Sequence, residues 1–113
     1  SKIKEIAGDD AEVIVTGDFN SDLVRDKSFS MLIDTTGEMT LVDSKRICAT
    51  PASGPSFSGS GLKVNSRTKG TEIDHIFVRN IKSSMAYKVI DDYEGDVYPS
   101  DHFPVLTVLK FDR

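Results

Sequence analysis

The sequence predicts a small α+β domain with at least four strands. Its 113 residues are enough for one domain. Short runs of apolar and β-branched residues recur along the chain, and segments rich in Gly, Ser, Asp and Pro separate them. Helical spacing of apolar residues is confined to two stretches in the first third of the chain. Strands should therefore form most of the core.

The first third should contain a helix end, a strand and one or two short helices. Residues 2–7 have apolar side chains at helical spacing, and Gly8 with two aspartates ends that pattern. Residues 12–16 form a β-branched run typical of a buried strand. Residues 22–35 fit one or two short helices, and residues 39–43 fit a short strand or a turn.

The remainder should be mostly strands and loops. Residues 52–70 are rich in Ser and Gly and predict a long surface loop, interrupted by a short strand, near the rim of a site. Residues 72–79 and 85–90 predict strands, and residues 91–98 an acidic loop. The last run, 104–111, is apolar on both faces, which predicts a strand in the centre of a sheet.

Composition excludes several classes of protein. The net charge is −4 and the basic residues are scattered, which disfavours a dedicated nucleic-acid binder without excluding one. Cys48 is the only cysteine, so an internal disulfide and a Cys-rich zinc site are excluded. No apolar run approaches the roughly 20 residues that span a bilayer. Nothing in the sequence assigns a compartment.

The first chemical motif is Gly17-Asp18-Phe19-Asn20, directly after a predicted strand. Side chains two residues apart in extended chain point the same way, so Asp18 and Asn20 can act together. A carboxylate can hold or deprotonate water, and an amide can donate to a phosphate oxygen without adding negative charge. The structural alternative is a turn in which these side chains bond the backbone.

The second motif places Asp74 inside the apolar run 73–78. Burying a carboxylate is costly without a partner, and His102 is the candidate. His75 lies on the opposite face of the same strand, so Asp74 and His75 should not act together. The structural alternatives are a cap or a surface pair for Asp74, and a satisfied, half-buried strand residue for His75.

The third motif is Ser100-Asp101-His102-Phe103-Pro104-Val105. Pro104 favours extended backbone before it, which places His102 at a loop mouth. Asp101 and His102 point apart and can serve separate tasks, with Asp101 toward a metal or its waters. Oxygen ligands of this kind suit Mg²⁺ or Mn²⁺. Three carboxylates, one amide and one histidine together suit metal-assisted cleavage of a phosphate ester.

These three motifs, in this order, closely resemble the last three signature blocks of the endonuclease/exonuclease/phosphatase superfamily, whose fold is that of DNase I. The resemblance runs over essentially the whole chain. It implies a four-layer αββα sandwich with the site at the strand ends. It also implies roles: Asp18 orients or activates the attacking water, Asn20 binds phosphate, His102 held by Asp74 stabilises the transition state, and Asp101 lies at or near the metal.

One departure from the family pattern is large. Members open with an Asn-bearing strand and a later metal-binding Glu, and nothing in this chain matches either. A complete family domain is about twice this length. We therefore expect residues 1–113 to be the C-terminal half of the domain, with the N-terminal half absent. An exposed apolar sheet face should then favour that missing half or self-association, and the isolated chain should be inactive.

The sequence therefore predicts part, about half, of a Mg²⁺-dependent (or Mn²⁺-dependent) phosphoesterase that hydrolyses a phosphodiester or phosphomonoester by activated water. The acidic balance favours a small phosphodiester, a phospholipid or a sugar phosphate as the substrate. A DNA or RNA nuclease of the same superfamily is the first alternative. A non-catalytic interaction module on the same scaffold is the alternative from a different class.

Overall fold

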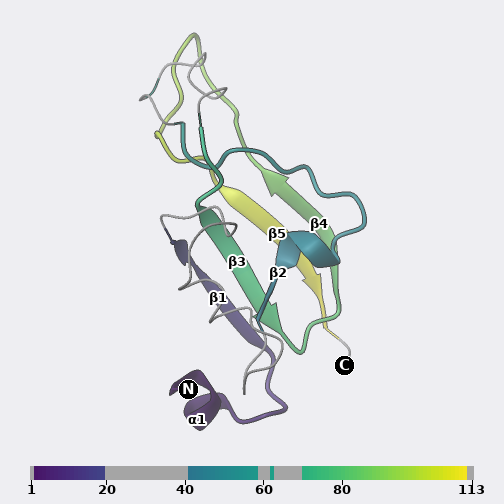
Figure 1. Cartoon of the computed structure of the whole chain (residues 1–113). Helices are drawn as coiled ribbons and strands as arrows, with labels where there is room; N and C mark the ends of the chain where they lie inside the picture. The colour runs from purple at the N-terminus through teal and green to yellow at the C-terminus, as the bar shows by residue number, and fades with distance from the viewer. Residues whose placement is uncertain (1, 20–40, 59–61, 63–69, 112–113) are drawn as a thin grey trace.

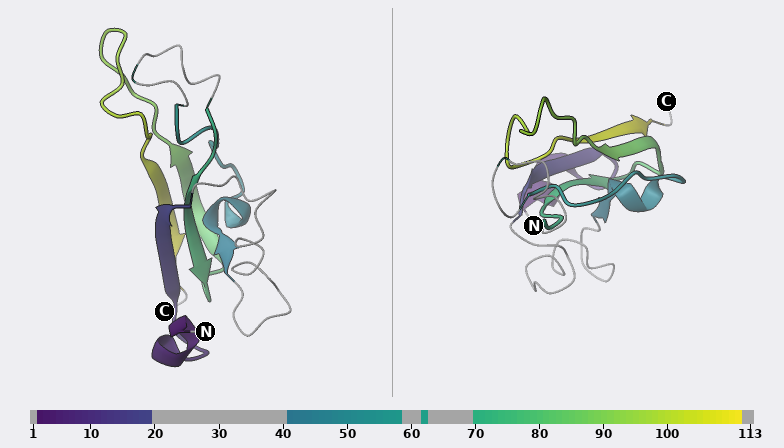
Figure 2. Two further views of the ribbon diagram at one scale, coloured as in Figure 1. Left: turned by 60° about the vertical axis from the view of Figure 1, so that its left-hand side comes forward. Right: turned by 90° about the horizontal axis from the view of Figure 1, so that it is seen from above.

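The computed structural model describes residues 2–19, 41–58, 62 and 70–111, with the side chains of residues 2–4 left aside. The described residues form two antiparallel sheets that lie one behind the other (Figures 1 and 2). One sheet has the strand order β1-β3-β2, and the other pairs β4 with β5. This architecture confirms the predicted α+β class with at least four strands.

The first sheet is built around β3, Asp74–Arg79, which β1, Val13–Asp18, flanks on one side. The two strands are antiparallel and in continuous register, so Val13 faces Arg79 at one end and Asp18 faces Asp74 at the other. The short strand β2, Val42–Asp43, flanks the other side. Asp43 caps the 3-10 helix η1, Ser44–Ile47, by accepting from the Lys45 amide at 3.0 Å.

The second sheet is a hairpin-like pair whose connection passes the site. β4, Ser83–Val89, is antiparallel to β5, Val105–Lys110, with a bulge between Ser84 and Ala86. Residues 90–104 join them, and the predicted acidic loop of residues 91–98 within this connection turns through Gly95, whose φ is +65°. β4 begins two residues before the predicted start, because Ser83 and Ser84 already pair with Lys110 and Leu109 of β5. The Ser84 hydroxyl bonds the Ala86 carbonyl and the Thr107 hydroxyl.

The N-terminal helix α1, Lys2–Ala7, confirms the predicted helix end, and Gly8 follows it at a φ of +74°. It lies at the end of the molecule opposite the loop of residues 91–98 (Figure 1). The Asn80 side chain ties this end to the sheet, because it donates to the carbonyls of Asp9 and Ala11 at 2.9 and 2.8 Å.

The core is aromatic and divided between the two sheets. Phe77 and Val78 of β3 are fully buried, and Leu41 lies with them among the buried residues. A second cluster joins Cys48, Tyr87, Val89, Tyr98 and Phe103. Cys48 is a buried free thiol that packs in this second cluster.

Three predictions about burial were wrong. β1 is not a buried strand, because its side chains alternate and Ile14 is 48% exposed. β5 is not central among the described residues, where it pairs with β4 alone and leaves Leu106 46% exposed. The stretch 52–58 is not wholly a surface loop, because Ser56 and Ser58 are fully buried. The predicted helices at 22–35 lie outside the described residues.

Candidate active site

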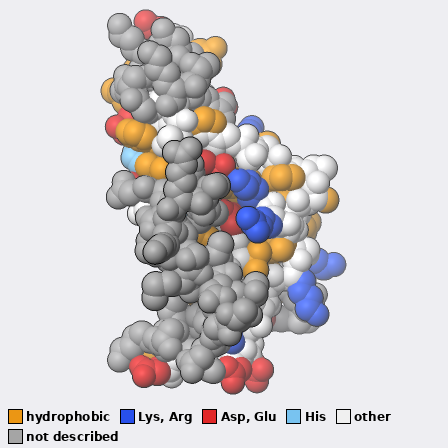
Figure 3. Space-filling view, viewed as in Figure 1, with side chains coloured by type: hydrophobic (Ala, Val, Ile, Leu, Met, Phe, Trp, Pro, Cys, Tyr) orange, Lys and Arg blue, Asp and Glu red, His pale blue; other side chains and the backbone are white. Residues whose placement is uncertain are grey.

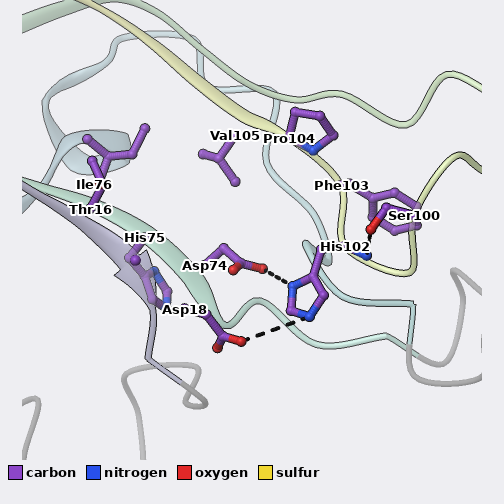
Figure 4. A pocket seen from close by; sticks show the side chains of 11 residues that line it. Thr16, Asp18, Asp74, His75, Ile76, Ser100, His102, Phe103, Pro104 and Val105 are labelled. Carbon is purple, nitrogen blue, oxygen red and sulfur yellow. Dashed lines mark hydrogen bonds and ion pairs between the residues drawn. The ribbon is translucent and has the colours of Figure 1, made fainter.

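Asp18, Asp74 and His102 converge at one end of the first sheet (Figure 4). Asp18 is the last residue of β1 and Asp74 is the first residue of β3, and their Cα atoms are partners in the antiparallel register. His102 comes from the segment that leads into β5. The candidate ligand atoms of the three side chains lie within 4.8 Å of one another. Asp18 and His102 are 84 positions apart in the sequence. The pairing of β1 with β3 and the segment that leads into β5 bring them together.

His102 lies between the two carboxylates. Its Nδ1 is 2.9 Å from Asp74 Oδ2, a hydrogen bond, and its Nε2 is 3.9 Å from Asp18 Oδ2, an ion-pair distance (Figure 4). Like charges directly opposite in a sheet repel each other. An imidazole between Asp18 and Asp74 offsets that repulsion most when it is protonated.

The electrostatics follow from this placement. The hydrogen bond to Asp74 raises the pKa of His102 above its ordinary value. Partial burial opposes this, while the negative charges of Asp74, Asp18 and Asp101 add to it. The pair therefore favours a positively charged imidazole at the site, with Asp74 fixing the ring through Nδ1.

The backbone around His102 is held by its neighbours. The Ser100 hydroxyl accepts from the His102 amide at 3.1 Å, and the Phe57 ring lies 4.9 Å from the imidazole between centroids. Phe57 also forms an isolated bridge with His102. These contacts hold the segment before Pro104, and His102 lines the hollow described next.

A hollow of about 640 Å³ opens beside these side chains. Asp18, Asp74 and His102 line it together with apolar residues of both sheets, among them Ile76 and Val105 (Figure 4). The polar groups are thus gathered at one part of a largely apolar wall. A site of this composition can orient a small anionic group against a few charged side chains.

Of the five predicted site residues, the structure brings three together: Asp18, Asp74 and His102. Asp101 is adjacent in sequence but its carboxylate is outside that group of three; its carbonyl accepts from the Ser58 amide at 2.8 Å. The role of Asp101 toward a metal stays a prediction. Asn20 lies outside the described residues.

A second polar cluster lies next to the site and was not predicted. The His75 Nδ1 is 3.1 Å from Asp43 Oδ2, and both side chains are buried. Glu72 completes the cluster and pairs with the Lys45 ammonium. His75 thus serves a different carboxylate from Asp74, as the alternation of the strand predicted. Asp43 follows the apolar pair Leu41-Val42, which was the sequence signal for it.

The two groups differ in how well they suit a cation. Asp43 already pairs with His75 and Glu72 with Lys45, so a metal there would have to displace the Lys45 ammonium. Asp18 and Asp74 present carboxylate oxygens to an open hollow, and such oxygens suit a hard divalent cation. The donor set at the site therefore fits a metal of this class.

The family assignment rests on a match over most of the chain. The model of the endonuclease/exonuclease/phosphatase family matches residues 2–102. This chain belongs to that family. The two antiparallel sheets are part of its DNase I-like fold, as the resemblance implied.

Solved structures of the family superpose on this chain. A mannosyl-6-phosphatase of Bacteroides thetaiotaomicron is 33% identical, with a TM-score of 0.79, over 97% of this chain and 42% of its own. An endonuclease/exonuclease/phosphatase family protein of the same organism is 32% identical, with a TM-score of 0.79, over 98% of this chain and 40% of its own. A Bacteroides vulgatus member is 27% identical, with a TM-score of 0.62, over 98% and 40%. Curated protein sequences gave no match. The chain thus spans about two fifths of the length of these relatives.

Proposed function

We propose that this chain carries the Asp18, Asp74 and His102 part of the active site of a metal-dependent phosphoesterase. The observation that carries the proposal is the position of His102 between two opposed carboxylates beside an open hollow. Membership of a hydrolytic family supports the reaction class.

The chemistry of these side chains fits hydrolysis by activated water. Asp18, partly exposed at the end of β1, would orient the water and accept its proton. His102, protonated and held by Asp74, would donate from Nε2 to a phosphoryl oxygen as negative charge develops there. Asn20 would bind the phosphate, in keeping with the sequence motif.

A divalent cation, Mg²⁺ or Mn²⁺, would neutralise charge on the phosphate oxygens when bound. Carboxylate oxygens of the open site would hold it, and Asp101 is the residue that we assign to it from the sequence. The hydrogen bond between Asp74 and His102 forms without the cation.

A sugar phosphate is the substrate class that we favour. The mannosyl-6-phosphatase relative supports a phosphomonoester of a sugar. The face in Figure 3 shows Lys and Arg side chains in separate small groups and not in one stripe among the described residues, which does not favour a nucleic acid. A nuclease remains the alternative within the family, and a non-catalytic interaction module remains the alternative outside it.

The open sheet faces support a partner for this chain. Leu106 and Val108 of β5 and Ile14 of β1 are more than two fifths exposed, and β1 and β5 each pair on one side only among the described residues. We propose that an N-terminal half covers them, with self-association as the alternative. Within the described residues, no helix is long and apolar enough to cross a membrane.

The test compares this chain with a version extended at its N-terminus. Both are assayed on mannose 6-phosphate and on bis-p-nitrophenyl phosphate, with Mg²⁺ and with EDTA. Hydrolysis by the extended form alone, lost in EDTA, is the expected result. A salt titration of DNA binding tests the nuclease alternative, because counterion release makes such binding steeply salt-dependent. If His102→Ala leaves every function of the extended form intact, the protein is a non-catalytic interaction module.

A further inference from the structure

We propose that Ser56 is a positioning residue for the Asp74–His102 pair, an inference that rests on the proposed function. The Ser56 hydroxyl oxygen accepts from the backbone amides of Ile73 and Asp74, at 3.0 and 2.9 Å. The Ser56 carbonyl accepts from the amide of Phe103 at 2.7 Å. One residue therefore bonds the first residue of β3 and the residue that follows His102.

The residues after Ser56 strengthen the same link. The Phe57 amide donates to the Thr71 carbonyl at 3.0 Å, ahead of β3, and Phe57 also bridges His102. The Ser58 amide donates to the Asp101 carbonyl at 2.8 Å, on the other side of the imidazole. Residues 56–58 thus form a strap between the start of β3 and the segment 101–103.

Burial makes the hydroxyl of Ser56 hard to replace. Ser56 is 0% exposed, so no bulk water reaches the two amides if the oxygen is removed. β2 pairs with β3 only at Phe77 and Val78, so it does not reach the start of β3. The Ser56 oxygen accepts from the Asp74 amide, which in a wider sheet would donate to the carbonyl of a neighbouring strand.

The consequence falls on the geometry of the site. The hydrogen bond between Asp74 and His102, 2.9 Å long, joins the start of β3 directly to the segment 101–103, and residues 56–58 bond both segments. Without the Ser56 oxygen, Asp74 keeps its pairing with Asp18 but loses the hydrogen bond that ties it, through Ser56, to the segment of His102. Misplacement by about 1 Å can cost on the order of 100-fold in rate. Binding of the phosphate should suffer less, because Ser56 does not line the hollow.

The experiment uses the full-length protein with Ser56→Ala, Ser56→Thr and the matched control Ser84→Ala. Ser84 is also a buried serine with two hydroxyl hydrogen bonds, but it lies in β4 and bonds Ala86 and Thr107. We expect Ser56→Ala to lower kcat by about 10- to 100-fold with KM little changed, and Ser84→Ala to leave both unchanged. Ser56→Thr keeps the oxygen and should retain most of kcat.

A second readout is independent of turnover. The low-field NMR resonance of the His102 Nδ1–H proton reports its hydrogen bond to Asp74 and should shift or vanish in Ser56→Ala alone.

If wild-type protein shows no hydrolysis, the proposed function fails and this resonance decides the role of Ser56. An unchanged resonance, or an unchanged kcat where turnover exists, overturns the inference, as does a kcat loss in Ser56→Thr equal to that in Ser56→Ala. If Ser56→Ala does not fold, Ser56→Cys, a weaker acceptor of similar size, is judged by the same two readouts.

Discussion

Replacement of Asp74 by asparagine tests the electrostatic account of the site most directly. Asp74→Asn keeps an oxygen that can accept from His102 Nδ1 at the observed distance of 2.9 Å, and removes only the charge. The variant should therefore fold like the wild type while its imidazole loses the main cause of its raised pKa.

The size of the effect follows from the hydrogen bond and its exposure. A hydrogen bond to a charged group contributes about 1.5–3 kcal/mol, against about 0.5–1.5 kcal/mol for a neutral one. The His102 side chain is 35% exposed, so solvent screening places the difference at about 1 kcal/mol. In the full-length protein, this predicts that kcat/KM falls by roughly fivefold to tenfold at neutral pH.

The pH dependence has a definite sign. A histidine whose pKa is raised on folding contributes stability that is present below its unfolded pKa, near 6.5, and is lost as pH rises through the folded pKa. The gap in unfolding free energy between wild type and Asp74→Asn should thus be larger at pH 6 than well above the folded pKa of His102. The alkaline limb of activity should move to lower pH in the variant.

The assay is an NMR titration of both imidazoles, with urea unfolding at the same pH values. His75, the other histidine in the sequence, bonds to Asp43 and serves as the internal reference. The expected result is a lower pKa for His102 in Asp74→Asn and an unchanged curve for His75. A His102 pKa equal in both proteins would refute the reasoning, since Asp74 would then not set the charge of the imidazole.

Three further variants test the contacts that stabilise the two sheets. His75→Ala leaves the Asp43 carboxylate buried without its partner and should cost about 3–5 kcal/mol in urea unfolding; a loss under about 1 kcal/mol would mean that water already reaches Asp43. Tyr87→Phe should be neutral or stabilising by up to about 1 kcal/mol in thermal unfolding, because the buried hydroxyl has no hydrogen-bond partner among the described residues; a clear loss of stability would reveal a bound water. Asn80→Ala should cost about 2 kcal/mol by the same measurement, since it loses two hydrogen bonds and strains a residue whose φ is +60°, and Asn80→Gly should recover only the strain.

The environment of Tyr87 also keeps its buried hydroxyl protonated. Burial raises the pKa of Tyr87, and the carboxylates of Asp43, Glu72 and Asp74 raise it further. The hydroxyl therefore stays neutral at the interface between the polar cluster next to the site and the site itself.

Local sequence features predicted the site better than the sheet edges. Alternation along the strand predicted that Asp74 and His75 act apart, because alternation is a local rule, and the cost of an unpaired carboxylate pointed to His102 as the candidate partner of Asp74. The same rules failed for Ile14 and Leu106, since apolar composition indicates that a surface will be covered but not by which segment. Pairing partners depend on chain distant in sequence.

Ser56 shows a second kind of limit. A serine among other Ser and Gly residues is typical of an exposed loop, yet its hydroxyl is fully buried and accepts from two amides. No periodicity marks such a residue, because its partners are backbone atoms that every residue possesses. The apolar neighbours of Asp43 indicate that it is buried, whereas only the structure shows that Ser56 is buried and bonds two amides.

The register between β1 and β3 constrains how this sequence can change over evolution. Asp18 and Asp74 face each other only while the six paired positions from Val13↔Arg79 to Asp18↔Asp74 stay aligned. A single-residue deletion inside β1 would move Asp18 to the opposite face of the sheet, and one inside β3 would move Asp74 to the face that now holds His75. Length variation among homologues should therefore be tolerated between the strands and excluded within 13–18 and 74–79, a pattern of gaps that would identify these two strands even where the residues themselves have diverged.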